Sequence, residues 1–365
     1  MYNWLCYHYH SLKHAEVDIV EKTYNEMMNQ PAALRKTFDL LLSRRAQVQA
    51  FITNFQPQGY VAVGCGSGYC LCHSAAFSLE KSTGLPTHAF PAGDLMLHAE
   101  EYAPLLNNRI LIIPTRSGST SELLMAIEAA RKVANVKVLA ITAVAHSPVS
   151  DLADLCLEIP WAFDDSVCQT RTVSNLYCAS LLISAIVSGQ DSMIAELEKM
   201  ILGLHDFMAA NKAPLAGIAK TEWDNAVILA DGEMSGLASE GSMAFTEIAQ
   251  LHAHYYHFLD VRHGPMVLVT DKTLVVCALR PEGWHQQIRV LEDCKKRGAT
   301  VVAVVDNDFV PDCADLTLSF HQEMHNAVAG IPLITVIQQI AVAKADVRGL
   351  DADSPEGLVA YVKLD

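Results

Sequence analysis

The chain has 365 residues, 51% of them hydrophobic, which is enough for two ordinary domains that each bury a core. A formal net charge of −15 and the lack of a Lys/Arg-rich block argue against nucleic acid as a partner. No apolar run reaches the roughly 18 residues of a membrane span, and the ten cysteines show no repeated C-x-x-C pair. We therefore expect a cytoplasmic protein with reduced thiols and without a signal peptide, membrane contact or metal site.

The N-terminal part is predicted to be a helical leader. Residues 15–50 combine helical spacing with good helix formers, interrupted at Gln30 and Pro31, where proline suits the first turn of a new helix. From about residue 51, amphipathic stretches alternate with short apolar runs, namely YVAVG, RILIIPT, KVLAITAV and LCLEIP. This alternation is typical of a parallel sheet covered by helices.

The second half repeats this order, with the apolar runs AVILADG, TLVVCALR, TVVAVVDN and LTLSF. The repetition suggests duplication of one α/β unit. Residues 173–210 are predicted to form long helices, with a break between the units near residues 211–214. The predicted organisation is a leader (1–50), two α/β units (51–210 and 211–350) and a tail (351–365), each unit being a parallel sheet flanked by helices, as in flavodoxin-like and Rossmann-like folds.

The strongest local signal is the turn at residues 115–121, which follows an apolar strand and leads into a helix. Backbone N–H groups at a helix start bind anions, and six of these seven residues are Ser, Thr or Arg, whereas capping the helix needs one. The spacing of a nucleotide P-loop is absent. We therefore predict a phosphate monoester site with four hydroxyls and one cation, from Thr115, Ser117, Ser119, Thr120 and Arg116.

A second glycine-rich turn, VAVGCGSGYC, follows the first strand. It would lie at the carboxyl edge of the sheet, where open α/β folds bind ligands. Gly64, Gly66 and Gly68 are spaced two apart and do not form the G-x-G-x-x-G pattern, so a dinucleotide site is disfavoured and no cofactor is predicted. We expect Ser67 to face the ligand.

Two carboxylates share one predicted helix stripe. Glu240, Ala244, Glu247 and Leu251 fall at helical spacing. A glutamate beside alanine and leucine on a partly buried stripe would have a raised pKa, suited to proton transfer near neutrality. A solvated face with ordinary glutamates is the alternative, and the sequence does not decide between the two.

Four histidines follow this stripe. His252, His254 and His257 have no acidic or thiolate partner at a metal-ligand spacing, so we expect helix-surface histidines and no metal. His263 lies in Arg-His-Gly-Pro, a turn before the strand-like MVLVTDKTLVV, and can exchange a proton at physiological pH. A Glu and a His beside a phosphate site suffice for aldose–ketose chemistry, in which Glu247 carries the proton and His263 opens the sugar ring.

The motifs TRSGSTSE, SEGSMAFTE and RHGP, in this order, resemble the double-SIS (sugar isomerase) family, which includes the isomerase half of glucosamine-fructose-6-phosphate aminotransferase. The resemblance covers roughly residues 20–350. It includes the leader, where TYNEMMNQPAALRKTFD is similar to the E-x-x-x-QP segment that precedes the first SIS domain. The fold that this resemblance implies is two tandem SIS domains after a helical leader.

The resemblance also implies roles for individual residues. Thr115, Ser117 and Thr120 match the phosphate-binding hydroxyls, and Arg116 takes the place of a sugar-contacting Gln. The segment that lines the sugar matches Val167, Gln169 and Thr170. Glu247 matches the isomerisation base, and Glu240 belongs to the same site. His263 matches the ring-opening His, which in the family reaches in from the neighbouring subunit, so a homodimer is implied.

Two lysines of the aminotransferase are missing. Its helix Lys corresponds to Ala244 and its tail Lys to Ala360, with Lys363 nearby. No glutaminase domain precedes the SIS units, so we expect no ammonia production from glutamine. Relatives of this length resemble fructosamine-phosphate deglycases, amino-sugar-phosphate deaminases and phosphosugar isomerases.

Three functions are therefore considered on the basis of the sequence. The first is an enzyme that isomerises a phosphorylated sugar or amino sugar, with C–N cleavage. The second is a non-catalytic phosphosugar-binding regulator, although such regulators usually carry one SIS domain beside a DNA-binding module. The third, a dinucleotide-dependent oxidoreductase, would require a glycine fingerprint that this sequence lacks.

Overall fold

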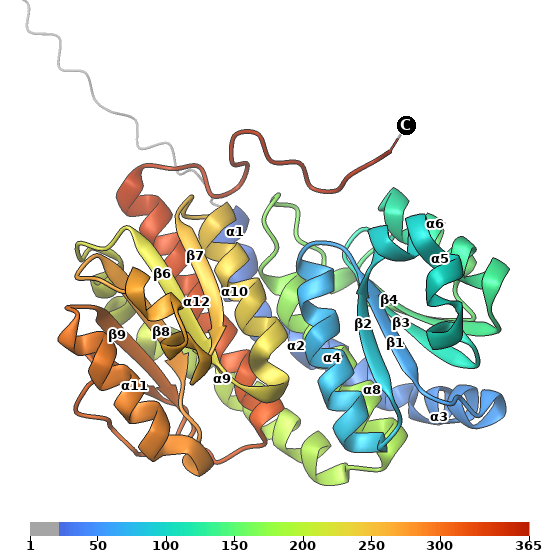
Figure 1. Ribbon diagram of the computed structural model, residues 1–365, viewed down its shortest axis with the longest axis horizontal. Helices are drawn as coiled ribbons and strands as arrows, with labels where there is room; N and C mark the ends of the chain where they lie inside the picture. The colour runs from blue at the N-terminus through green and yellow to red at the C-terminus, as the bar shows by residue number, and fades with distance from the viewer. Residues whose placement is uncertain (1–21, 365) are drawn as a thin grey trace, which may run out of the picture.

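The structure is a computed structural model that describes residues 22–364, so the first 21 residues of the predicted leader lie outside it. It contains two five-stranded sheets in which all paired strands run parallel (Figure 1). The first has the order β2-β1-β3-β4-β5, formed by β1 (Tyr60–Gly64), β2 (Thr87–Pro91), β3 (Arg109–Thr115), β4 (Val136–Thr142) and β5 (Leu155–Glu158). The second has the order β10-β9-β8-β6-β7, formed by β6 (Asn225–Ala230), β7 (His252–His257), β8 (Thr273–Ala278), β9 (Thr300–Val305) and β10 (Leu316–Ser319).

Helices cover both faces of each sheet. The leader contributes α1 (Lys22–Met28), α2 (Gln30–Ser43) and α3 (Arg45–Phe55). The first unit adds α4 (Ser67–Thr83), α5 (Ala92–Leu106), α6 (Ser121–Val133), α7 (Pro148–Leu152) and α8 (Arg171–Ser188), and α9 (Asp191–Ala219) leads to the second unit. The second unit contains α10 (Ser235–Glu247), α11 (Trp284–Lys296) and α12 (Asn326–Arg348). Short 3-10 turns lie at Pro160–Ala162, Gly232–Met234, Asp260–Arg262, Pro265–Leu268 and Pro281–Gly283.

The strands β1 and β8 are buried along their whole length because helices cover both faces of each sheet. All five residues of β1 and all six of β8 are buried, which explains their continuous apolar sequences. The edge strand β7 instead contains only exposed and half-buried residues. The alternating two-unit α/β fold predicted from the sequence is therefore confirmed.

One hydrophobic core joins the two units. It includes Leu71 of α4, Leu181 of α8, Phe245 of α10 and Ile337 of α12, which lie between the two sheets. Separate cores fill the outer faces, under α5 and α6 on the first sheet and under α11 on the second. Because α4 packs against α10 through this shared core, a residue of the second unit can reach the carboxyl edge of the first sheet.

Two helices, α8 and α12, are long and apolar enough to cross a membrane by composition, but 83% and 89% of these segments are buried inside the protein. Both belong to the core that joins the sheets. Their apolar sequences are therefore explained by burial between the two sheets.

The structure corrects several details. His252, His254 and His257 lie in strand β7 and not on a helix, because α10 ends at Glu247 and the H-x-H spacing has the two-residue period of a strand. Leu251 consequently lies beyond the helix that carries Glu247. The strand expected from residue 266 begins at Thr273, after a 3-10 turn.

The expected break at residues 211–214 lies inside helix α9, which continues through Pro214 to Ala219. This helix packs against both α12 of the second unit and α2 of the leader. A helix with partners in both halves gives no clear boundary, so the proposed limits at residues 50, 210 and 350 stay predictions.

Candidate functional site

The candidate site is a cavity of about 240 Å³ at the carboxyl edge of the first sheet. Its walls come from the turns after β1 and β3, from residues 167 and 169 in the segment before α8, from the end of α10, and from residues 358–362 of the tail. Both halves of the chain therefore contribute to it. A cavity at this edge agrees with the general position of ligand sites in open α/β sheets.

The turn after β3 supplies hydroxyl groups to this cavity. Thr115, Ser117 and Thr120 line it, and Thr120 is the residue before the first turn of α6. The Thr120 hydroxyl makes no capping hydrogen bond, so it stays available to a ligand. Gly118 has φ of +61°, and a Cβ there would lie 2.2 Å from the Ser147 hydroxyl, so this tight turn requires glycine.

Three other hydroxyls of this turn, those of Thr115, Ser117 and Ser119, make hydrogen bonds within the turn. The Thr115 hydroxyl accepts the Gly118 amide at 3.2 Å, and the Ser117 hydroxyl accepts the Ser119 amide at 3.2 Å. The Ser119 hydroxyl turns back to the Ser117 carbonyl at 3.1 Å, and Ser119 is not among the residues that line the cavity. Three of the four predicted hydroxyls thus lie at the cavity, next to the N-terminus of a 13-residue helix.

Arg116 is buried, with 6% of its surface exposed, and it also lines the cavity. Its guanidinium donates to the backbone carbonyls of Ser166 (3.0 Å) and Val167 (2.9 Å), and to that of Ala360 in the tail. Burial lowers the pKa of this guanidinium, opposed by the nearby carboxylates of Asp164 and Glu247. Arg116 therefore joins its own turn to two further walls of the cavity by these contacts, rather than standing as a free cation.

Glu247 is the last residue of α10 and lines the cavity from the second unit. Burial raises its pKa, and the positive charge of Arg116 opposes that rise. Helix α10 packs closely on α4, which brings Glu247 to this position. The two helix backbones are so close that a Cβ on Gly236 would lie 2.1 Å from the carbonyl oxygen of Cys70, so glycine is needed there. A carboxylate with a raised pKa therefore faces the same cavity as the Thr/Ser turn.

Glu240 lies two turns earlier on α10 and is 2% exposed. Burial raises its pKa well above the usual range, with the charge of Glu247 as the next contribution. Its Oε2 has no hydrogen-bond partner within residues 22–364. Ser67, the first residue of α4, is 5% exposed, lines the cavity and lies 3.6 Å from the Met243 sulfur of α10. Glu240 itself is not a lining residue, whereas Ser67 is.

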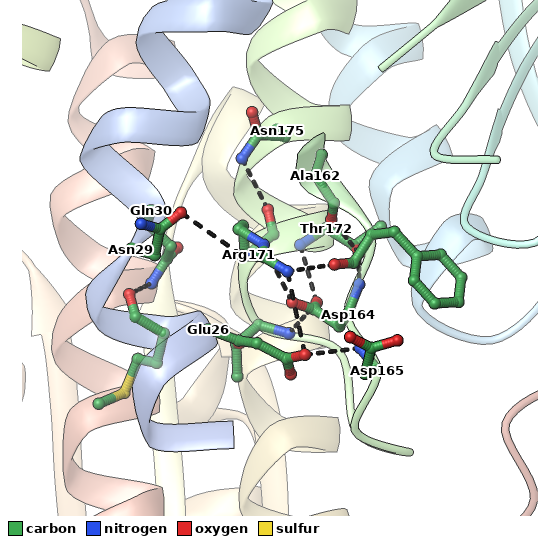
Figure 2. Close-up of polar contacts among 12 residues, drawn as sticks. Glu26, Asn29, Gln30, Ala162, Asp164, Asp165, Arg171, Thr172 and Asn175 are labelled. Atoms are coloured by element: carbon green, nitrogen blue, oxygen red, sulfur yellow. Dashed lines mark hydrogen bonds and ion pairs between the residues drawn. The ribbon is translucent and has the colours of Figure 1, made fainter. Parts of the chain in front are cut away.

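The segment before α8 is held by buried carboxylates, as Figure 2 shows. Glu26 of α1 accepts the backbone amides of Asp165 (2.6 Å) and Ser166 (3.4 Å). Asp164 accepts the amides of Thr170 and Thr172, both at 2.8 Å, and burial raises its pKa to about 6. These bonds fix the segment that presents residues 167 and 169 to the cavity.

Arg171 lies between these two carboxylates (Figure 2). Its nitrogens are 3.9 Å from Glu26 and 3.6 Å from Asp164. Val167 and Gln169 line the cavity, but Thr170 is fully buried and does not. A sequence signal for Glu26 existed, since it is the Glu of the E-x-x-x-QP segment, but no role was predicted for it.

The tail forms one wall of the cavity, through residues 358–362. In Figure 1 it runs from the end of α12 across to the first unit. The Asp353 carbonyl accepts the Val167 amide at 2.9 Å, while its carboxylate accepts the Lys22 and Thr23 amides of α1 at 2.9 and 2.7 Å. Further along, the Leu364 amide donates to the Ser121 hydroxyl at 3.1 Å. The sequence predicted no lining role for residues 358–362, because backbone contacts leave no residue pattern.

His263 is exposed, follows the 3-10 turn Asp260–Arg262, and does not line the cavity of its own chain. A role for it in this cavity therefore requires a second chain. No lysine lines the cavity within the described residues, and Lys363 is not among its walls. Over the same part of the chain, no group of three or more His, Cys, Asp or Glu residues is placed to hold a metal ion.

Comparison with known proteins decides the family. The SIS domain model matches residues 59–186 and 221–344, one match in each half of the chain. The chain belongs to the SIS domain family. These two matches show that this SIS protein carries two copies of the domain, as the sequence motifs indicated.

Curated relatives of this SIS protein include the glutamine–fructose-6-phosphate aminotransferases (isomerizing) of Chlamydia trachomatis and Methanothermobacter thermautotrophicus, at 24% and 25% identity. The alignments cover 97% and 93% of this chain, but 61% and 57% of those proteins. The chain therefore spans about three fifths of the length of these relatives.

Solved structures show the same fold. A glucosamine-6-phosphate deaminase from Thermotoga maritima matches with a TM-score of 0.77 at 24% identity, over 94% of this chain and 100% of that one. A tagatose-6-phosphate ketose/aldose isomerase from Escherichia coli matches with a TM-score of 0.81 at 20% identity, over 94% and 97%. The SIS protein thus shares its whole two-domain architecture with these proteins.

Proposed function

We propose that this SIS protein is an enzyme that acts on an amino-sugar or fructosamine phosphate by aldose–ketose proton transfer, with release of the amine. The observation that carries the proposal is the position of Glu247. Its carboxylate, whose pKa burial raises, lines the same cavity as the hydroxyls of Thr115, Ser117 and Thr120. The names of the relatives, which include a phosphosugar isomerase and an amino-sugar-phosphate deaminase, support the substrate class.

The phosphate would bind at the N-terminus of α6, where backbone amides and the three hydroxyls offer hydrogen bonds. For the open-chain form of a 2-amino aldose phosphate, Glu247 removes the proton on C2 and returns it to C1, while one proton passes from the amino nitrogen to O1. The product is a 2-imine, and water then replaces its nitrogen to give a ketose phosphate and ammonia. This scheme needs no lysine, in keeping with the lysine-free walls of the cavity over the described residues.

The further site assignments belong to the same proposal. Ser67, Arg116, Val167 and Gln169 would contact or frame the sugar, because they line the cavity. Ser119, Thr170 and Glu240, which do not line it, would act through their neighbours. Sugar-ring opening is assigned to His263 of a second subunit in a homodimer.

A cytoplasmic location is also proposed. Nine cysteines of the described part of the chain are free thiols, which suits a reducing compartment.

The test is to incubate the purified protein separately with glucosamine-6-phosphate, galactosamine-6-phosphate and fructosamine-6-phosphate, and to measure ammonia, free amine and ketose phosphate. Turnover of one substrate that is lost in Glu247→Gln supports the enzyme and names its substrate. Tight binding of these ligands without any turnover would instead support the phosphosugar-binding regulator.

A further inference from the structure

The second SIS unit has a cavity of its own, of about 350 Å³, at the carboxyl edge of the second sheet. Its walls come from the ends of β8 and β9, the segment after β10 and the first turns of α12. The two sheets have the same strand order, with β6 and β8 in the places of β1 and β3. The cavity therefore lies at the edge that corresponds to the candidate site of the first unit.

The chemistry of this second cavity differs from that of the first. The turn after β8, residues 280–284, reads Arg-Pro-Glu-Gly-Trp and contains no Ser or Thr. Three carboxylates line the cavity, those of Glu282, Asp306 and Glu323, against one guanidinium, that of Arg280. Since Arg280 already lies 3.7 Å from Glu282, the remaining charge at this cavity is negative. A phosphate group would be repelled here, and an ammonium group attracted.

Neutral polar groups and apolar walls complete the lining. The His325 Nδ1 accepts the Ala327 amide at 3.2 Å, so in the neutral imidazole the proton is on Nε2, which can donate. Phe320 and Met324 provide apolar surface. Asn326, 6% exposed, and Asp306 each leave one buried side-chain oxygen, Oδ1, without a hydrogen-bond partner within residues 22–364. Such acceptors favour a ligand that is rich in O–H and N–H donors.

We propose that this second cavity binds an amino sugar without a phosphate group, that is, a polyhydroxylated ring with an ammonium group placed beside Asp306. The inference rests on the cavity of the second unit alone and stands independently of the reaction proposed above. The two units would then bind similar ligands that differ in the phosphate group. The second unit could bind an unphosphorylated amino sugar while the first cavity is occupied.

The experiment measures binding of glucosamine, glucose and glucosamine-6-phosphate to the full chain by calorimetry or ligand-observed NMR. Glucosamine should bind about tenfold more tightly than glucose, the difference expected for one charged hydrogen bond. Asp306→Asn should remove this preference, while thermal unfolding shows that the variant is folded. Thr115→Val, in the first cavity, should leave glucosamine binding unchanged. Asp306→Asn should in turn leave the binding of glucosamine-6-phosphate unchanged, because that ligand is expected in the first cavity.

The proposal is overturned if glucosamine binds no better than glucose. It is also overturned if glucosamine binding is lost in Thr115→Val but retained in Asp306→Asn, because the ligand would then occupy the first cavity. Weaker binding of glucosamine-6-phosphate in Asp306→Asn would contradict the charge argument, because it would place the phosphorylated sugar in the second cavity. Arg280→Met provides a second variant of the same wall, and we expect it to leave the preference for the ammonium group intact.

Discussion

The guanidinium of Arg116 donates a hydrogen bond to the backbone carbonyl of Ala360, although the two residues are 244 positions apart in the chain. The same guanidinium donates to the carbonyls of Ser166 and Val167. Arg116 thus links the phosphate turn, the segment before α8 and the tail, three walls of one cavity. In the proposed enzyme its role is to hold the cavity closed around the substrate.

Replacing Arg116 with methionine should therefore loosen the tail. We expect KM for the phosphosugar to rise about tenfold or more, since three charge-assisted hydrogen bonds are lost, with a smaller effect on kcat. Limited proteolysis should cleave the tail faster. Arg131→Met is the matched control, because Arg131 makes an exposed ion pair with Asp154 away from the cavity. Equal effects of the two variants would contradict the role given to Arg116.

Glu247→Gln should lower kcat by about a hundredfold to ten-thousandfold, the usual contribution of a general base. Because burial raises the pKa of Glu247, kcat/KM of the native protein should rise with pH above the ordinary range of a glutamate, about 4.3. This limb of the pH profile should vanish in the variant. Glu222→Gln, at a side chain that is 94% exposed, serves as control and should match the native protein.

The role of His263 can be tested by mixing two inactive variants. If His263 acts in the cavity of the neighbouring subunit, each heterodimer of Glu247→Gln and His263→Ala chains contains one intact site. Random exchange of subunits should then restore roughly a quarter of native activity. Sedimentation of the native protein as a dimer is the accompanying measurement. If the protein is a monomer, or if the mixture stays inactive, His263 does not act in the cavity of a neighbouring subunit.

The buried carboxyl group of Asp164 should make the stability of the protein depend on pH. Its pKa is raised to about 6 in the folded chain by burial, from about 3.9 when unfolded, so the folded state binds more protons between these values. Its contribution to stability is fully present below about pH 4 and is lost as the pH rises through about 6. Urea unfolding at several pH values measures the free energy of unfolding. Between about pH 4 and 6 this free energy should decrease less in Asp164→Asn than in the native protein. An unchanged slope would show that Asp164 ionises freely.

Much of the fold could be predicted from local patterns. The continuous apolar runs of β1 and β8 identify buried parallel strands, because only strands covered on both faces lack polar alternation. The start of α6 after Thr120 also follows from its Ser/Thr-rich turn. The edge strand β7 was misassigned to a helix, since its histidines continued an apolar helical stripe that in fact ends at Glu247.

The candidate site also contains parts that local sequence patterns predict and parts that depend on long-range contacts. Its local parts could be predicted from the sequence: the Ser/Thr turn at residues 115–120, the Gly-rich turn with Ser67, and the helix that carries Glu240 and Glu247. Each depends on neighbouring residues and on the geometry of one helix or turn. Three features follow from the folded chain alone: Glu247 of the second unit lines the cavity, Glu26 holds the segment before α8, and the tail forms one wall of the cavity. These contacts join residues far apart in the chain, largely through backbone amides and carbonyls, and every residue type carries such groups.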